Sequence, residues 1–339
     1  MSEIAIIGAG AWGTALSIVL TRAGNHQVRL WVHEKEVCYT IAQKRENEKF
    51  LPGQAIPSSV TACNELGKAL DGAAIIVSVM PSQHCRQLFQ QMRPFLRAET
   101  IIVSATKGLE ENSLLRMTEL IAQIIKHGDF PLRIGALSGP SFALEAARGD
   151  PTAITIASQD RDLTRTVQRE FSHASFRVYT NDDPIGVELG GALKNVIAIA
   201  AGVSAGLGLG HNSVAALITR GLSEMTRLVV ACGGKAETMA GLAGLGDLVL
   251  TCTGGLSRNR SVGVELGRGR KLPEILAGMH GAVAEGIFTT TAAVGLARAH
   301  SVEMPISEQM YAILHEGKAP RDAIRELMTR SGKSEALRA

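Results

Sequence analysis

The chain has 339 residues, of which 45% are hydrophobic and 20% are charged, and its formal net charge is +3. This length exceeds what a single hydrophobic core usually serves, so we expect two domains. The small net charge, without any block of basic residues, argues against nucleic acid or an anionic membrane as a partner.

The first half of the chain, up to Tyr179, alternates short β-branched runs with amphipathic helical stretches. This alternation is typical of βαβ units and of a mostly parallel sheet. The predicted strands are residues 4–7, 27–32, 74–79, 100–104, 133–137, 152–157 and 176–179. The predicted helices are residues 12–23, 34–46, 83–92, 111–125, 141–147 and 160–171, and residues 50–57 are predicted to form a loop bounded by Pro and Gly.

The second half, after Tyr179, shows helical periodicity to the end of the chain. Asp183-Pro184 is a suitable start, with Asp as the N-cap and Pro at the first helical position. We therefore predict an α/β protein with a mostly parallel sheet domain at residues 1–182 and an all-α domain at residues 183–339.

The cysteines and the apolar segments indicate where in the cell the protein is expected. Five cysteines, at positions 38, 63, 85, 232 and 252, are scattered without CxxC spacing, which argues against a disulfide framework and a zinc site. The N-terminus lacks the basic segment of a signal peptide. The stretch from Val196 to Gly210 is shorter than the roughly 20 apolar residues of a membrane span. We expect a cytoplasmic protein without such a span.

A glycine-rich turn, Gly8-Ala-Gly10-Ala-Trp-Gly13, follows the first predicted strand and opens the first helix. These glycines allow a tight turn, close approach of the backbone to a pyrophosphate and close packing of helix on strand. The amides at the helix start would face the phosphates. We expect a Rossmann-like dinucleotide-binding domain; the alternative is a tight turn without a ligand.

The tip of the second strand bears on the choice between NAD and NADP. A carboxylate there usually binds the ribose of NAD, whereas this chain has His33 followed by Glu34. A histidine tolerates a 2′-phosphate that a carboxylate would repel. Both cofactors therefore remain open.

Two other predicted strands end in polar segments, Ser104-Ala-Thr-Lys107 and Ser138-Gly139-Pro-Ser141. Ligands of open α/β sheets bind outside the carboxyl ends of strands, so Lys107 and Ser141 are candidate site residues. The alternatives are an ordinary loop lysine and a helix N-cap.

Lys194 is the most unusual residue of the second half, because no Asp, Glu, Lys or Arg follows it until Arg220. Burial disfavours the charged form of a lysine and turns its amine into a usable proton donor and acceptor. The alternative is a lysine that extends its apolar stem along a helix with its amine in water.

Asp247 lies in an apolar, glycine-rich segment, and a buried carboxylate needs a partner as much as a buried lysine does. Lys194 and Asp247 are thus a plausible pair. Thr251, four residues later, would share the helix face of Asp247.

Ser257-Arg258-Asn259-Arg260 offers a guanidinium and an amide suited to a phosphate or carboxylate. The alternative is that this segment forms a basic surface turn. No histidine has a metal-ligand spacing, so we predict neither a metal nor a covalent intermediate.

Taken together, these segments closely resemble the bacterial-type NAD(P)-dependent sn-glycerol-3-phosphate dehydrogenases. The matching pieces span nearly the whole chain in order: GAGAWGTAL from Gly8, LWVHE from Leu30, ATKGLE from Ala105, SGPSFA from Ser138, GGALKNVIAIAAG from Gly190, ALITRGL from Ala216, GLAGLGDLVLTCT from Gly241, SRNR from Ser257 and EMPI from Glu303.

The resemblance implies reversible hydride transfer between NAD or NADP and dihydroxyacetone phosphate, giving sn-glycerol 3-phosphate for phospholipid synthesis. It implies that Lys194 transfers the proton and that Asp247 and Lys107 are further catalytic residues. The implied substrate-binding residues are Lys107, Gly139, Ser141, Lys194, Asp247, Thr251, Ser257, Arg258 and Asn259. The implied cofactor-binding residues are Gly8, Gly10, Ala11, Trp12, Gly13, His33, Lys107, Ala143, Arg258, Val283 and Glu285.

The resemblance also implies a homodimer, without integral membrane association. Two other functions compete with this interpretation. One is a two-domain dehydrogenase acting on a hydroxy acid or a ketopantoate-like substrate, which would not need the SRNR segment. The other is a non-catalytic sensor that binds NAD(P)H and signals through its helical domain.

Overall fold

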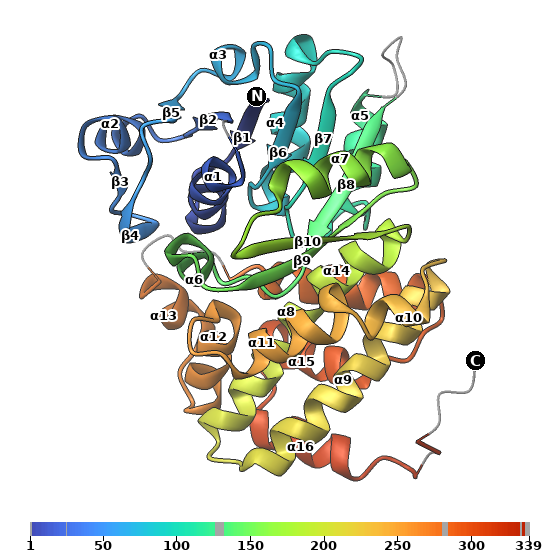
Figure 1. Ribbon diagram of the computed structural model, residues 1–339. Helices are drawn as coiled ribbons and strands as arrows, with labels where there is room; N and C mark the ends of the chain where they lie inside the picture. Colours follow the sequence, from blue (N-terminus) through green and yellow to red (C-terminus); the bar gives the residue numbers. More distant parts are fainter. Residues whose placement is uncertain (1, 25, 126–131, 280–283, 333, 336–339) are drawn as a thin grey trace. The chain divides into compact units, whose positions relative to one another are not determined.

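The computed structural model describes residues 2–24, 26–125, 132–279, 284–332 and 334–335. The chain divides into two compact units, whose elements are labelled in Figure 1. The first comprises Met1–Lys107 and Leu115–Glu188, and the second comprises Gly108–Leu114 and Leu189–Ala339. The short segment Gly108–Leu114 therefore belongs to the second unit although it lies in the first half of the sequence.

The first unit is built on an eight-stranded sheet with the order β10-β9-β8-β7-β6-β1-β2-β5. Neighbouring strands pair in parallel, except β8 and β9, which are antiparallel. The predicted mostly parallel sheet is confirmed. The strands are β1 (Glu3–Ile7), β2 (Gln27–Trp31), β5 (Val60–Cys63), β6 (Ile75–Ser78), β7 (Ile101–Ser104), β8 (Arg133–Ser138), β9 (Thr152–Ala157) and β10 (Phe176–Asn181).

The order of the strands creates a switch point between β1 and β6. From β1 the chain builds the sheet toward β2 and β5, and it then returns to add β6 and β7 on the other side. In open α/β sheets, ligands bind outside the carboxyl ends of the strands at such a point. The glycine-rich turn follows β1 directly, so the fold places it there.

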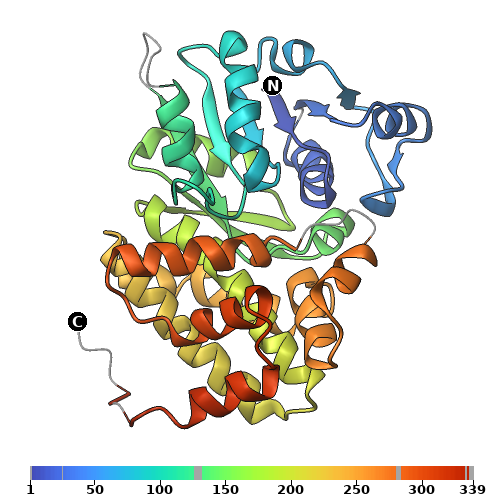
Figure 2. The ribbon, with the colours of Figure 1, turned by 180° about the vertical axis from the view of Figure 1, so that it is seen from behind.

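Helices cover both faces of this sheet (Figures 1 and 2). Alternate residues of β1 enter different cores, with Ile4 and Ile6 in one and Ala5 and Ile7 in the other, as the two-residue period of a strand requires. The first core is shared with α1 (Ala11–Ala23), α2 (Lys35–Lys44), α6 (Ala143–Arg148) and α7 (Arg161–Phe171). The second is shared with α3 (Leu66–Leu70), α4 (Cys85–Met92) and α5 (Met117–Ile125).

The loop predicted for residues 50–57 is wrong in part, because it contains β4 (Leu51–Ala55), which pairs antiparallel with β3 (Glu46–Asn47). Gly53 has a φ of 77°, and its amide donates to the Glu46 carboxylate at 2.6 Å. This side-chain contact sustains a short ribbon that contains Pro and Gly. The edge strand β5 was not predicted either, and α5 starts at Met117 rather than at residue 111.

Apart from Gly108–Leu114, the regular elements in the described part of the second unit are helices. It comprises α8 (Pro184–Gly206), whose first residues still belong to the first unit, α9 (His211–Ala231), α10 (Ala236–Met239), a π-helical turn η3 (Leu242–Gly246), α11 (Asp247–Thr253), α12 (Arg258–Gly267), α13 (Leu272–Ala277), α14 (Gly286–Ala299), α15 (Pro305–His315) and α16 (Pro320–Met328). Among the described residues, α8 has the length and composition of a membrane span, but 94% of its apolar window is buried inside the protein. A core helix shows the same pattern.

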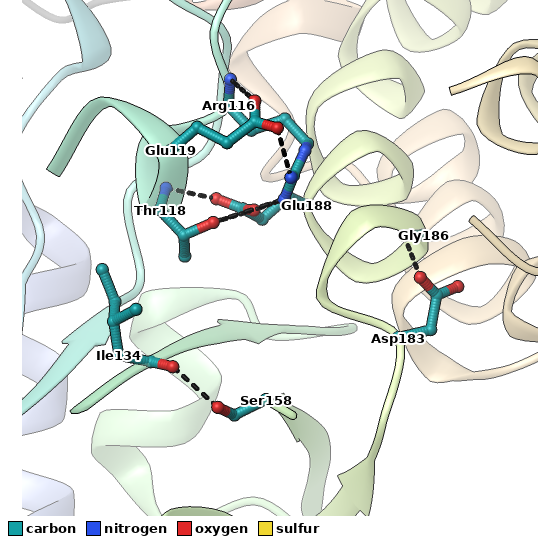
Figure 3. A network of polar contacts seen from close by, with 8 residues as sticks. All are labelled: Arg116, Thr118, Glu119, Ile134, Ser158, Asp183, Gly186 and Glu188. Carbon is teal, nitrogen blue, oxygen red and sulfur yellow. Dashed lines mark hydrogen bonds and ion pairs between the residues drawn. The ribbon is translucent and has the colours of Figure 1, made fainter. Parts of the chain in front are cut away.

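The start of α8 is held by contacts of two carboxylates, those of Asp183 and Glu188 (Figure 3). The Asp183 carboxylate accepts from the amide of Gly186 at 2.9 Å, so the predicted cap is confirmed. One turn later, the buried Glu188 pairs with Arg116 and accepts from the amide and hydroxyl of Thr118 at 2.8 and 2.6 Å. Burial raises the pKa of Glu188, although Arg116 and Thr118 oppose the shift. These bonds fix the first turns of the helix that carries Lys194.

Candidate active site

The glycine-rich turn has the backbone that its sequence requires. Gly8 has a φ of 120°, and a Cβ there would lie 2.7 Å from the carbonyl oxygen of Val79. A Cβ on Gly13 would lie 1.8 Å from the oxygen of Gly8. A side chain on Gly8 would push the turn away from the backbone that follows β6, and one on Gly13 would push α1 away from the turn, so both glycines are needed for this close packing.

The space beside Gly10 suits a phosphate. Gly10 is the N-cap of α1, but it has no side chain to bond the first amides, and the first turn carries no acidic residue. Nothing lies within 4 Å of a Cβ built on Gly10. A helix start with uncapped amides and open space attracts anions. The residues of this turn therefore fit a dinucleotide pyrophosphate.

The tip of β2 carries His33, which is exposed, and Glu34, which is half-buried and precedes α2. The Glu34 carboxylate pairs with Lys49 at 3.4 Å. Lys49 comes from the β3–β4 hairpin and also lies over the ring of Phe50. The carboxylate at this tip is thus partly neutralised, and both NAD and NADP stay compatible with the charges.

The ends of β7 and β8 meet at Lys107 and Gly139. The Lys107 amine donates to the Gly139 carbonyl at 3.4 Å, and the Ser141 hydroxyl donates to the same oxygen at 3.0 Å. Ser141 is not an N-cap, because α6 starts at Ala143 with Phe142 in the capping position. A Cβ on Gly139, whose φ is 139°, would lie 2.9 Å from the backbone of Ile154. Lys107 and Ser141 thus lie at neighbouring strand ends and share one acceptor, the Gly139 carbonyl.

Lys194 and Asp247 are in contact, as the sequence suggested. The Lys194 amine lies 2.7 Å from the Asp247 carboxylate and donates to the Thr251 hydroxyl at 2.6 Å. The Thr251 hydroxyl in turn donates to the Asp247 carbonyl at 2.6 Å. Lys194 is 5% exposed and Asp247 1%, so the amine does not extend into water. The carboxylate and hydroxyl hold this buried cation in one orientation.

Glycines bring the two helices close enough for this contact. A Cβ on Gly190, one turn before Lys194, would lie 2.7 Å from the carbonyl oxygen of Ala243. A Cβ on Gly244 would lie 2.2 Å from the Met239 oxygen. Gly190 is therefore required where α8 meets the π-helical turn that leads directly into Asp247, and Gly244 is required for that turn to pack against the end of α10. Such turns frequently occur at functional sites.

Asn259 lies in a second polar network of the same unit. Its side-chain amide donates to the Asn195 oxygen at 3.0 Å, and its oxygen accepts from the amide of Gly286 at 3.0 Å. Asn259 thus joins α8, next to Lys194, to the start of α14, next to Glu285. Val283, the other predicted cofactor-binding residue of this segment, lies outside the described residues.

The predicted phosphate-binding segment starts α12. The Ser257 hydroxyl is the N-cap and accepts from the amide of Arg260 at 3.2 Å. Arg258 is exposed at the first helical position, whereas Asn259 is buried. Within the described part of the chain, Arg258 has no hydrogen bond or ion pair. Its guanidinium is thus available to an anion beside the start of a helix.

Cys252 follows Thr251 on α11, and it is buried. Burial raises its pKa to about 12, although Lys194 and Arg260 oppose the shift. The thiol therefore stays protonated and is a poor nucleophile, which leaves the amine as the reactive group of this cluster.

Two residues with a role in these networks were not predicted from the sequence. Asn195 was overlooked because an uncharged amide beside Lys194 carries little signal on its own. Asn47, whose side-chain amide donates to the carbonyl of Ala9 at 2.8 Å, lies just before the segment that was predicted to be a loop. In both cases a buried asparagine needs hydrogen-bond partners, but the sequence does not say which.

Comparisons with known proteins agree with this geometry. Sequence models described as the NAD-dependent glycerol-3-phosphate dehydrogenase N-terminus and C-terminus match residues 3–164 and 183–325. The chain is 65% identical to glycerol-3-phosphate dehydrogenase [NAD(P)+] of Koribacter versatilis, covering 99% of each chain, and 54% identical to that of Acidobacterium capsulatum, covering 99% and 100%.

Among solved structures, glycerol-3-phosphate dehydrogenase from Coxiella burnetii is 43% identical, with a TM-score of 0.92 over 97% of this chain and 99% of that one. This solved structure thus shares the fold of the chain over nearly its whole length. The chain therefore belongs to the NAD-dependent glycerol-3-phosphate dehydrogenase family.

Proposed function

We propose that this chain catalyses reversible hydride transfer between NAD(P)H and dihydroxyacetone phosphate, giving sn-glycerol 3-phosphate. The observation that carries the proposal is the buried Lys194 amine, held by Asp247 and Thr251 at 2.7 and 2.6 Å. A ketone that accepts a hydride becomes an alkoxide, which needs a proton donor of this kind. The substrate is inferred from the family to which the chain belongs.

In the reducing direction, the substrate C2 carbon takes up a hydride and the C=O electron pair moves to the oxygen. The nicotinamide cofactor supplies this hydride when bound. The Lys194 ammonium stabilises the developing alkoxide and then donates its proton to it, and the neutral amine regains a proton from solvent. In the oxidising direction the amine accepts the hydroxyl proton. Asp247 and Thr251 keep the amine oriented through both steps.

The phosphate group of the substrate supplies binding energy away from the reacting carbon. We assign its binding to Arg258, which is exposed at the first position of α12, and to the start of that helix. One hydrogen of the Asn259 side-chain amide is donated to Asn195, and the side-chain oxygen accepts from Gly286. We propose that the second amide hydrogen is donated to the phosphate. Ser257 caps the helix. Lys107, Gly139 and Ser141 provide further substrate contacts at the strand ends.

The cofactor is assigned to the first unit by its glycine-rich turn. Gly8, Gly10 and Gly13 allow the backbone to approach the pyrophosphate, and the amides of Ala11 and Trp12 face it. The tip of β2, with His33, accepts the adenosine ribose. The remaining cofactor contacts that we propose are Lys107, Ala143, Arg258, Val283 and Glu285.

At the level of the cell, the proposed product is a precursor for glycerophospholipid synthesis. We propose a cytoplasmic homodimer in which residues 1–182 bind the cofactor and residues 183–339 carry the substrate site. These assignments follow the behaviour expected of the family.

The test is a steady-state assay of NADH and NADPH oxidation with dihydroxyacetone phosphate and, in parallel, unphosphorylated dihydroxyacetone. Two charge-assisted contacts to the phosphate predict a kcat/KM at least ~10²-fold higher for the phosphorylated ketone. Equal efficiency on both ketones contradicts the proposal. Tight binding of NADH without turnover of either ketone supports the non-catalytic sensor instead.

A further inference from the structure

Asn47 lies in the β3–β4 hairpin of the first unit, and the proposed chemistry makes no use of it. Its side chain is fully buried. The side-chain amide donates to the carbonyl of Ala9 at 2.8 Å and to the hydroxyl of Thr14 at 2.8 Å. Its oxygen accepts from the amide of Phe50 at 3.1 Å. Both amide hydrogens and the oxygen of this one side chain are therefore engaged.

The contact with Ala9 controls the direction of a neighbouring amide. Ala9 stands between the first two glycines of the turn, and its carbonyl belongs to the same planar, trans peptide as the N–H of Gly10. In such a peptide the C=O and the N–H point to opposite sides. Asn47 holds the Ala9 carbonyl toward the hairpin. The Gly10 N–H of the same peptide must therefore point away from the hairpin.

The contact with Thr14 ties the same carboxamide to the first helix. Thr14 is fully buried, its amide donates to the carbonyl of Gly10 at 3.0 Å, and its hydroxyl donates to the Ala9 carbonyl at 3.3 Å. The Asn47 side chain, the Ala9 carbonyl and the Thr14 hydroxyl thus form a closed ring of hydrogen bonds. This ring braces the turn against α1 at the place where the backbone borders open space.

We propose that Asn47 is a positioning residue for the cofactor: it orients the pyrophosphate-binding turn from behind and so sets the affinity for NAD(P)H without touching it. The inference rests on the proposed function for the identity of the ligand. The alternative role, a purely structural one, is to hold the hairpin through Phe50.

The experiment compares the full-length wild type with Asn47→Ala and Asn47→Asp. The Asp variant keeps the oxygen that accepts from Phe50 but loses both donors to the turn, and the Ala variant loses all three bonds without adding charge. Leu51→Ala is the control, because Leu51 is buried in the same hairpin and makes no polar contact with the turn. The readouts are the Kd for NADH by calorimetry, kcat at saturating substrates, and the thermal midpoint.

We expect both Asn47 variants to raise the Kd for NADH about tenfold, the equivalent of one hydrogen bond, with kcat at saturation nearly unchanged. Leu51→Ala should lower the thermal midpoint without this loss of affinity. An unchanged Kd in Asn47→Ala, or an equal loss in Leu51→Ala, overturns the proposal. An effect in Asn47→Asp alone also overturns it, since charge repulsion would then be the cause. If the wild type binds NADH but does not reduce the phosphorylated ketone, the proposed function fails while the Kd comparison still stands.

Discussion

The Thr251 hydroxyl joins the Lys194 amine to the backbone of the helix that carries Asp247. It accepts from the Lys194 amine at 2.6 Å and donates to the carbonyl of Asp247 at 2.6 Å. Its spacing of four residues from Asp247 on one helix made a shared face predictable. The contact of both residues with a lysine on another helix was only a hypothesis, because sequence spacing carries no information on which helices meet.

Thr251→Val tests the hydroxyl, since valine keeps the shape but cannot accept from the amine. A lost hydrogen bond to a charged group costs about 1.5–3 kcal/mol, so we expect kcat to fall roughly 10- to 100-fold. Thr251→Ser, which keeps the hydroxyl, should stay near the wild type. Equal rates in the Val and Ser variants would show that the hydroxyl does not orient the amine.

Arg258→Met tests the proposed phosphate contact. At saturating NADH, where the proposed contact of Arg258 with the cofactor no longer limits the rate, we expect the kcat/KM for dihydroxyacetone phosphate to fall roughly 10²-fold through loss of a charge-assisted contact. The kcat/KM for unphosphorylated dihydroxyacetone, measured in the same way, should change much less. Arg268→Met is the matched control, because Arg268 is exposed just after the same helix and pairs with Glu265 at 2.8 Å. The assignment is wrong if both variants behave alike or if both ketones suffer equally.

At the scale of elements, α8 and α12 cross with almost no space between their backbones. A Cβ on Gly202 would lie 2.1 Å from the Arg260 carbonyl oxygen, and one on Gly263 would lie 2.0 Å from the Ile199 oxygen. Gly206 and Gly267 continue the contact one turn later, with corresponding distances of 2.2 and 2.5 Å. This crossing places Asn259 of α12 beside Asn195 of α8.

Gly202→Ala and Gly263→Ala should both destabilise the protein. Helix propensity alone favours alanine by about 1 kcal/mol, but the overlap with a carbonyl oxygen forces the helices apart at a cost of about 1–3 kcal/mol or more. We expect a net loss in urea denaturation. Ser204→Ala, on the same helix, is the control without a clash. A gain in stability in the glycine variants would contradict the close crossing.

The strands were predictable because Ile and Val runs buried on both faces mark central parallel strands. The β3–β4 hairpin was not, because Pro52 and Gly53 normally end a strand. Its pairing depends on a bond from the Gly53 amide to the Glu46 side chain. The helix predicted from residue 111 starts only at Met117, since Gly108–Leu114 belongs to the other unit and Leu114 has a φ of 60°.

At the scale of the whole molecule, the sequence offered the candidate residues and the pairing of Lys194 with Asp247, but not the buried polar networks that join distant segments. The spacing of the glycines from Gly8 identified the glycine-rich turn, and the long stretch without charged residues identified Lys194. The closed ring around Asn47 and the network of Asn195 and Asn259 join segments far apart in the chain, and each depends on tertiary packing. The buried Glu224 carboxylate also joins segments far apart in the chain, because it accepts from the amides of Ile306 and Ser307 at 2.7 and 3.3 Å.

Glu224 predicts how stability depends on pH. Burial raises its pKa to about 7, although the amides of Ile306 and Ser307 oppose the shift. The folded chain thus holds a proton that the unfolded chain releases near the ordinary glutamate pKa of 4.5. The contribution of Glu224 is therefore favourable below that value and is lost as the pH rises toward 7 and above.

The measurement is the free energy of unfolding in urea at pH 5 and pH 8, for the wild type and Glu224→Gln. Glutamine keeps an oxygen for the two amides but does not titrate. The wild type should lose more stability than the variant between these pH values. Parallel pH dependences in the two proteins would exclude Glu224 as the source.

The central claim is that Lys194 transfers the proton in ketone reduction, and Lys194→Met tests it most directly. The kcat with NADH and dihydroxyacetone phosphate should fall roughly 10²- to 10⁴-fold, the range of general acid catalysis, while the Kd for NADH stays near the wild-type value. Lys271→Met, at an exposed lysine of the same unit, should leave both quantities unchanged. Turnover near the wild-type rate in Lys194→Met, in a folded protein that binds NADH normally, would contradict the account.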